Sequence, residues 1–294
     1  MNHQFVLADW LPRIPWSEWS SANRHWAVPV TGPADLCLNE HLRRMLADSY
    51  DWGEPIEKDI FVWGKGETEL RTETKIGGLP YRASGKSWPT GPDGDPLPFL
   101  GQVNFSNSTD IISVSNDILL VFARIYEDLV EAACFEWQSI DPSLELVRRC
   151  EVPETVWKPH PFHGHIVRVK SFPAAVLRSS LDYPVIDGKP VCCDRLLLDY
   201  HATEIGKHPA VIQPCDSEIN DPICVLASLQ PATFGHSYPW VNESTPCDLD
   251  AEMERAEREV IEGYPDSQLM FGDGGSLYIY RDETGEICTH VSDY

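Results

Sequence analysis

The sequence predicts a strand-rich α+β fold, in which two pseudo-repeated β halves pack together beside a few flanking helices. Twenty-four prolines and nineteen glycines are spread along the 294 residues, and this density favours many short strands joined by turns over long helices. Hydrophobic residues make up 42% of the chain, which suffices to bury a core. Short segments that recur in the same order indicate that the strands form two related halves.

Apolar runs bounded by turn residues mark the expected strands. "PLPFLGQVNF" at 96–105 and "NDILLVFARIY" at 116–126 are rich in Phe, Val, Ile and Leu, a composition typical of buried strands. "CFEWQSI" at 134–140 and "HIVRVKSF" at 165–172 alternate apolar with polar residues. This alternation predicts strands with one face toward solvent.

Three pairs of similar segments carry the prediction of two halves. "TKIGGLPY" from Thr74 and "TEIGKHPA" from Thr203 share the pattern Thr-x-Ile-Gly-x-x-Pro. Each is followed by an apolar run, "PFLGQVNF" in the first case and "ICVLASLQ" in the second, and then by "DILLVFAR" or "GSLYIYRD". We therefore expect one domain over residues 67–294, with halves at about 67–140 and 195–294.

A separate Trp-rich segment is expected at residues 1–66. Four of the ten tryptophans lie within its first 26 residues, and apolar residues recur with helical spacing at 33–48. A second helix is predicted at 245–263, because Thr245 suits the N-cap and Gly263 marks the end. The glutamates of this helix mostly face away from its apolar stripe. These two segments supply the flanking helices of the predicted fold.

Several of these blocks together resemble the YwqG-like family, a bacterial group catalogued as a domain of unknown function. The similar blocks are residues 74–81, the Trp88-Pro89 pair, the run at 96–105, "GKHPAVIQ" ending at Gln213, and "MFGDGGSLYIY" at 270–280. The resemblance covers roughly Thr68 to the C-terminus, and Lys207 and His208 depart from the family's pattern. It implies a strand-rich α+β fold with duplicated halves and no established chemistry. Because some members lie beside toxin genes, it also implies an immunity or binding role.

Two glycines, Gly77 and Gly78, come directly before Leu-Pro-Tyr. Glycines adopt backbone angles closed to other residues and let a neighbouring chain approach closely, so we expect this segment to set a crossing of the chain. The alternative is a loop that grips a ligand. Asp273, between two glycines, is expected to cap local N–H groups at a hairpin entry, with a role as metal ligand as the alternative.

Acidic residues outnumber basic residues by 46 to 23, which gives a formal net charge of −23. This charge argues against nucleic acids and anionic membrane surfaces as partners. The last 52 residues hold fourteen acids and three bases. We expect a basic protein, such as a toxin, to dock there, with Glu254, Glu257 and Glu259 as binding residues on the second helix. The alternative is a solvated surface that keeps the protein in solution.

A cytoplasmic location without cofactors is expected. No apolar run reaches the length of a membrane span, and the first ten residues lack the basic start and apolar centre of a signal peptide. Nine cysteines occur with no Cys-x-x-Cys pair. This spacing favours reduced thiols over a disulfide framework or a structural zinc site.

A histidine cluster offers a different kind of function. The segment at 159–167 contains His160, His163 and His165, and the last two would point to the same side of a strand. No metalloprotease motif accompanies them. A metal-dependent enzyme that uses these histidines is therefore only the alternative to a binding role. The sequence favours a non-catalytic protein-binding role, as an immunity protein or scaffold in a bacterial toxin or conflict system. A second alternative is a small-molecule binding module in the cleft between the halves.

Overall fold

The computed structural model describes residues 50–51, 53–65, 67–126, 129–155, 157–159, 161–171, 176–177, 185–186, 189–190, 202–209, 219, 221–228, 269, 271 and 275–292. The strands in these ranges are β1 (Tyr50–Asp51), β2 (Ile56–Lys65), β3 (Lys75–Ile76), β4 (Phe99–Asn104), β5 (Ile118–Tyr126), β6 (Leu129–Gln138), β7 (Phe162–Ser171), β8 (Val176–Leu177), β9 (Val185–Ile186), β10 (Lys189–Pro190), β11 (Glu204–Ile205), β12 (Pro222–Ala227), β13 (Ser276–Arg281) and β14 (Ile287–Ser292). A short 3₁₀ helix, η1, spans Arg149–Glu151.

The prediction of an α+β fold is wrong. Strands account for 45% of the described residues, and none of those residues lies in an α-helix. The helix signals came from 33–48 and 245–263, and both segments lie outside the described residues. Within the described part, β-branched and aromatic runs interrupted by proline and glycine decide the structure. This part also contains no helix long and apolar enough to cross a membrane.

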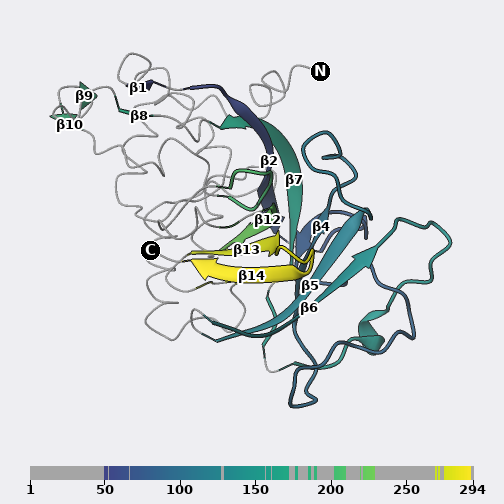
Figure 1. Ribbon diagram of the computed structural model, residues 1–294. Coiled ribbons are helices and arrows are strands. Elements are labelled where there is room, and N and C mark those ends of the chain that lie inside the picture. Colours follow the sequence, from purple (N-terminus) through teal and green to yellow (C-terminus); the bar gives the residue numbers. More distant parts are fainter. Residues whose placement is uncertain are drawn as a thin grey trace.

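One large sheet dominates the fold (Figure 1). Its ten strands follow the order β14-β13-β12-β11-β2-β7-β3-β4-β5-β6, and neighbouring strands are antiparallel. The central pair is the longest, because β2 and β7 pair over ten positions, from Ile56 opposite Ser171 to Lys65 opposite Phe162. Two small antiparallel pairs, β1 with β8 and β9 with β10, lie apart from this order.

The strand order consists of two matching sets of five that meet between β2 and β7. On one side β7 is followed by β3, β4, β5 and β6, and on the other β2 is followed by β11, β12, β13 and β14. Equivalent hydrogen bonds occur at equivalent positions of the two sets. The N–H of Gly164 donates to the carbonyl of Thr74 at 2.9 Å, and the N–H of Phe61 donates to the carbonyl of Thr203 at 2.9 Å.

The side chains of the same two threonines also have matching partners. Thr74 Oγ1 accepts from the N–H of Asn104 at 2.9 Å, and Thr203 Oγ1 accepts from the N–H of Ala227 at 3.0 Å. The first residues of β4 and β12 carry a register shift at the same place, between Phe99 and Gly101 in one and between Pro222 and Cys224 in the other. The three pairs of similar sequence segments thus occupy equivalent strands: β3 and β11, β4 and β12, β5 and β13.

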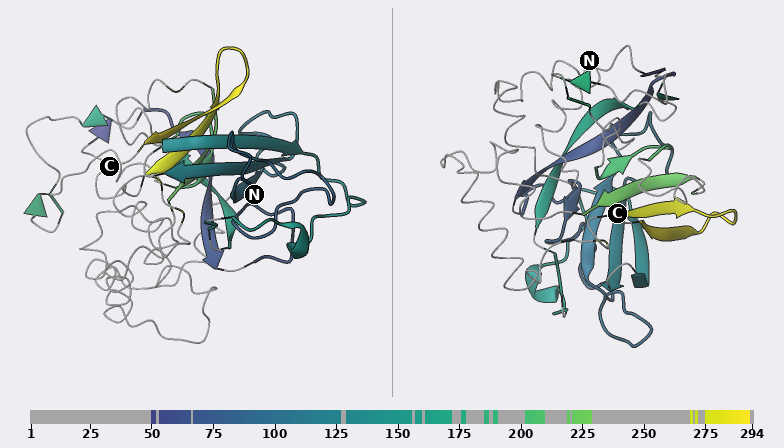
Figure 2. Two further views of the ribbon diagram at one scale, coloured as in Figure 1. Left: turned by 90° about the horizontal axis from the view of Figure 1, so that it is seen from below. Right: turned by 90° about the vertical axis from the view of Figure 1, so that its left-hand side faces the viewer.

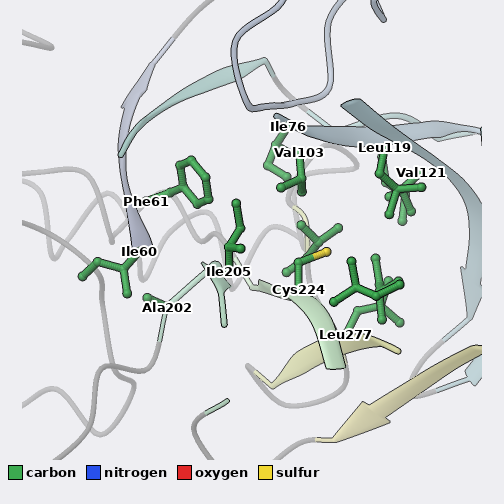
Figure 3. Packing of buried hydrophobic residues seen from close by; sticks show 14 of the residues in the cluster. Ile60, Phe61, Ile76, Val103, Leu119, Val121, Ala202, Ile205, Cys224 and Leu277 are labelled. Carbon is green, nitrogen blue, oxygen red and sulfur yellow. The ribbon is translucent and has the colours of Figure 1, made fainter. Parts of the chain in front are cut away.

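The main core lies between the two sets of strands. Figure 3 shows its residues coming from matching positions, with Ile76 near Val103 from one set and Ile205 near Cys224 and Leu277 from the other. These side chains are at most 1% exposed. The two ends of the strand order, β14 and β6, lie side by side (Figures 1 and 2). The sheet therefore curves back on itself and encloses this core.

A second, smaller core covers the opposite face of β4 and β5. Phe99, Leu120 and Phe122 are buried there under residues of the segment between β3 and β4, including Tyr81 and half-buried Trp88. The Trp88 ring meets Phe122 edge-on, with 5.2 Å between ring centroids. Both faces of these strands are thus buried, which explains why their sequences are continuous apolar runs rather than alternating ones.

Candidate functional site

The Gly-Gly loop, residues 77–80, follows β3 directly. Gly77 has φ +59° and Gly78 has φ +70°, values that residues with a Cβ atom rarely adopt. The N–H of Gly77 donates to the carbonyl of Leu100 at 2.7 Å, which ties the loop to β4. The chain then turns at Pro80, so that Tyr81 can enter the second core.

The carboxylate of Glu67 lies against this loop. The N–H of Leu79 donates to Glu67 Oε1 at 3.0 Å. A Cβ atom at Gly78 would overlap the same carboxylate, so the glycine leaves the space that the carboxylate fills. Glu67 belongs to the connection between β2 and β3, and its side chain is 26% exposed.

Two cations flank the carboxylate. Lys75 Nζ lies 3.7 Å from Glu67 Oε1, and Arg149 lies on the other side with Nη2 3.8 Å from Glu67 Oε2. The Lys75 side chain is 2% exposed and donates to the carbonyl of Leu79 at 3.2 Å, whereas Arg149 is 78% exposed. Burial lowers the pKa of Lys75 to about 8, and the charge of Glu67 opposes this shift. We call these residues, with the Gly-Gly loop, the Glu67 pocket.

A third cation, Arg71, holds the rim of the Glu67 pocket. Its Nη2 donates to the carbonyls of Pro80 at 2.6 Å and Val147 at 3.1 Å. Its Nε is buried and has no hydrogen-bond partner within the part of the chain that the structure describes. Burial lowers the pKa of Arg71, and the charge of Glu67 opposes the shift. The loop is therefore lined by donors that its own residues do not all use.

Buried Gln102 fixes the position of this loop from below. Its side-chain amide donates to the carbonyls of Arg71 at 2.8 Å and Glu73 at 2.7 Å, while its oxygen accepts from the N–H of Tyr81 at 2.7 Å. Gln102 and Lys75 are register partners on β4 and β3. Because all three bonds go to backbone groups, the loop has a defined shape before any ligand binds.

A second charged cluster fastens the segment after the loop. Arg82 is fully buried, and its Nε donates to Glu136 Oε2 on β6 at 2.8 Å. Its Nη1 donates to the carbonyl of Lys86 at 2.8 Å, and its Nη2 to that of Ser87. These bonds fold the backbone of Lys86 and Ser87 around the Arg82 guanidinium. The arrangement is structural and leaves the Glu67 pocket as the candidate site.

A buried ion pair joins two neighbouring strands, β2 and β11, of one set. Lys58 on β2 and Glu204 on β11 lie 2.6 Å apart, and each side chain is 2% exposed. Glu204 holds the position in β11 that Lys75 holds in β3, because each precedes the isoleucine of its short strand. Each set therefore has a lysine–glutamate pair at its first short strand, with the charges in opposite positions, and only the Lys58–Glu204 pair is buried on both sides.

The predicted site residues fall partly outside the described residues. Glu254, Glu257, Glu259, Asp273 and His160 lie there, so their roles stay predictions. Gly77 and Gly78 lie in the Glu67 pocket. Sequence reasoning missed Glu67, Arg71 and Arg149, since no motif marks them.

His163 and His165 lie two positions apart on β7, with Gly64 and Val62 as register partners on β2. His163 also pairs with Lys75 of β3. In the described ranges, no group of three or more His, Cys, Asp or Glu side chains is placed to hold a metal ion. Residues 162–167 of the histidine segment are therefore part of the central strand pair, and a metal-dependent enzyme stays the alternative prediction.

We expect the purified protein to hold no stoichiometric zinc, iron or manganese, because the sequence around the histidines carries no metal-binding motif such as His-Glu-x-x-His. Elemental analysis of the protein, prepared without chelators, measures this directly. One metal per chain that is lost in the His163→Ala/His165→Ala double variant would contradict the prediction and support a metal-dependent enzyme.

No curated protein gives a significant match to this chain. The model of a family described as a domain of unknown function, DUF1963, matches residues 74–283. This match spans well over half of the chain and begins at Thr74, the threonine whose carbonyl and side chain join β3 to its neighbours. The chain therefore belongs to the DUF1963 family of domains of unknown function.

Proposed function

We propose that the protein is a non-catalytic binding domain that takes a basic protein as its partner. The observation that supports this proposal is that the described basic side chains mostly pair with carboxylates of the same chain. Many lie within ion-pair distance of a carboxylate of the same chain: Lys58, Lys75, Arg82, Lys86, Arg124, Arg148, Arg149, Arg168 and Arg281. Their charge is neutralised internally and does little to balance the acidic surface.

The surplus of carboxylates reaches solvent. Exposed acids in the described ranges include Glu54, Glu69, Glu131, Glu145, Glu154, Glu283 and Glu286. With a net charge of −23 over the whole chain, the field outside the protein attracts cationic surfaces and repels nucleic acids and anionic lipids. Electrostatic attraction of this kind speeds the encounter with a basic partner.

The biological setting that we propose follows the resemblance to the YwqG-like family. Its first block, residues 74–81, contains β3 and the Gly-Gly loop, and the DUF1963 match begins at the same residue. We place the protein in the cytoplasm of a bacterium, as an immunity protein or scaffold in a toxin or conflict system. A toxin with a basic surface is the partner that suits the acidic chain.

The acidic C-terminal segment gives the test. We expect Glu254→Lys/Glu257→Lys/Glu259→Lys to slow association with the basic partner, mainly through the on-rate, because long-range attraction governs encounter. The partner is first captured from cells of the source organism with the tagged chain. Its association rate is then measured by surface plasmon resonance as ionic strength rises from about 0.05 to about 0.5 M, which shortens the screening length severalfold.

A matched control reverses three exposed acids elsewhere. Glu54→Lys/Glu145→Lys/Glu154→Lys changes the net charge by the same amount at sites that the structure describes as exposed. We expect it to slow association less than the C-terminal triple variant. Equal on-rates for wild type and the C-terminal variant across the salt series would show that this segment is not the docking surface. Capture of no basic protein would count against the proposed function itself.

A further inference from the structure

The Glu67 pocket gathers positive charge in a protein that is otherwise strongly acidic. Lys75 and Arg149 approach the Glu67 carboxylate to 3.7 and 3.8 Å, and Arg71 lies close enough for its pKa to respond to the same charge. Lys75 also senses the charge of Glu73, so three cations lie near two carboxylates, and this local excess of positive charge contrasts with the net charge of −23. Such a concentration of positive charge is what a bound anion requires.

Glu67 occupies this pocket but leaves some of its hydrogen-bond donors unused. Charge-assisted hydrogen bonds between nitrogen and oxygen are typically about 2.7–2.9 Å long, and both cations lie farther away than that. Lys75 has three donor hydrogens, of which one reaches the carbonyl of Leu79. Arg71 Nε adds a buried donor that is unused within the described residues. The pocket therefore offers more donors than the Glu67 carboxylate accepts from.

The Glu67 pocket is also partly accessible to solvent. The Glu67 side chain is 26% exposed and that of Arg149 is 78% exposed. Besides the Leu79 bond to Glu67, the loop is held by the Gly77 bond to Leu100 and, at its flanks, by the Gln102 bonds to Arg71 and Tyr81. Rotation of the Glu67 side chain toward solvent would thus expose the Leu79 N–H and the Lys75 ammonium without remodelling the loop.

We propose that the Glu67 pocket is a carboxylate-binding site which Glu67 occupies from within the chain, and that a ligand carboxylate can take its place. The ligand carboxylate accepts from the Leu79 N–H, lies over Gly78 where no Cβ intrudes, and pairs with Lys75 and Arg149. Glu67 competes with the ligand from within the chain, and so sets the concentration of free ligand that is needed to occupy the site. This site is separate from the acidic surface of the proposed function and does not depend on it.

The test removes the competitor and supplies a free carboxylate. We expect Glu67→Ala to lower the Tm and to gain a saturable stabilisation by sodium acetate of roughly 2 to 4 °C, as expected for a ligand that binds only the folded state of a chain of this size. Sodium chloride at equal ionic strength is the reference. In wild type, acetate should do no more than chloride, because Glu67 already fills the pocket.

Three further variants locate the effect. Adding Gly78→Ala to Glu67→Ala places a Cβ where the carboxylate lies, and we expect it to abolish the acetate effect. Glu283→Ala removes an exposed glutamate from the β13–β14 hairpin and should gain no acetate effect. If Glu67→Ala fails to fold, Glu67→Gln retains an acceptor for the Leu79 N–H, and acetate should still stabilise it more than it stabilises wild type.

Several outcomes would overturn the proposal. Equal effects of acetate and chloride on both Glu67 variants would mean that no carboxylate binds over Gly78. An acetate effect that survives the Gly78→Ala addition would mean the same. Inorganic phosphate that stabilises Glu67→Ala at lower concentration than acetate would overturn the carboxylate assignment. A failure of the basic-partner experiment would leave all of these measurements unaffected.

Discussion

Replacing Lys58 with methionine is expected to destabilise the fold by about 3 to 5 kcal/mol, the usual cost of breaking a buried ion pair by removing one partner. Lys58 and Glu204 lie 2.6 Å apart with 2% of each side chain exposed. Methionine fills most of the lysine volume, so little of the effect comes from a cavity. It leaves the Glu204 carboxylate buried without the ammonium that faces it. Urea unfolding of wild type and variant measures the difference in free energy.

The double variant Lys58→Met/Glu204→Leu separates charge from packing. We expect it to recover most of the lost stability, because an apolar pair of similar size avoids burying an uncompensated charge. Arg124→Met is the matched control, since it breaks an exposed pair with Asp93 and should change the stability little. A double variant no more stable than Lys58→Met would mean that Lys58 contributes through packing and not through its charge.

The strands that the sequence predicted best are those buried on both faces. The runs at 96–105 and 116–126 contain β4 and β5, because a strand with a core on each side must be apolar throughout. β6 and β7 were found only in part, since they begin at Leu129 and Phe162, ahead of the alternating stretches. Fold class was wrong because the helix signals were counted with the domain, although they fall outside its described strands.

The central strand pair could not have been predicted from local pattern. β2, with the sequence IEKDIFVWGK, mixes charged and apolar residues, and its partner β7 lies roughly a hundred residues later in the chain. Pairing at that distance is set by tertiary contacts rather than by local propensity. The two short strands β3 and β11 were visible only as the recurring Thr-x-Ile-Gly pattern.

The candidate site was likewise visible only in part. Gly77 and Gly78 stand out in the sequence, but nothing beside them shows that the carboxylate of Glu67, eleven residues before Gly78, fills the space over the loop. Arg149 comes from η1, far along the chain. A glycine signals that a close approach occurs, whereas the identity of the approaching group depends on the fold.

The matching strands β4 and β12 allow one substitution to be tested in two equivalent places. Gly101 on β4 and Cys224 on β12 hold the same register position, opposite Ile76 and Ile205. A Cβ atom at Gly101 would lie 2.5 Å from the backbone carbonyl oxygen of Lys75 and 3.3 Å from the Cα of Ile76. Backbone atoms cannot move aside without breaking the β3–β4 pairing, whereas position 224 already accommodates a buried side chain.

We therefore expect Gly101→Val to destabilise the fold by about 3 kcal/mol, at the upper end of the range for overpacking. Cys224→Val, which keeps a buried side chain of similar size, should cost less than about 1.5 kcal/mol. Urea unfolding of both variants gives the comparison. Because Gly101 lacks the positive φ of Gly77 and Gly78, its cost comes from the approach of β3 and not from backbone strain. Equal losses of stability at the two positions would show that β3 and β4 can separate. The Gly-Gly loop, which follows β3 directly, would then lack the rigid support on which a preformed carboxylate site depends.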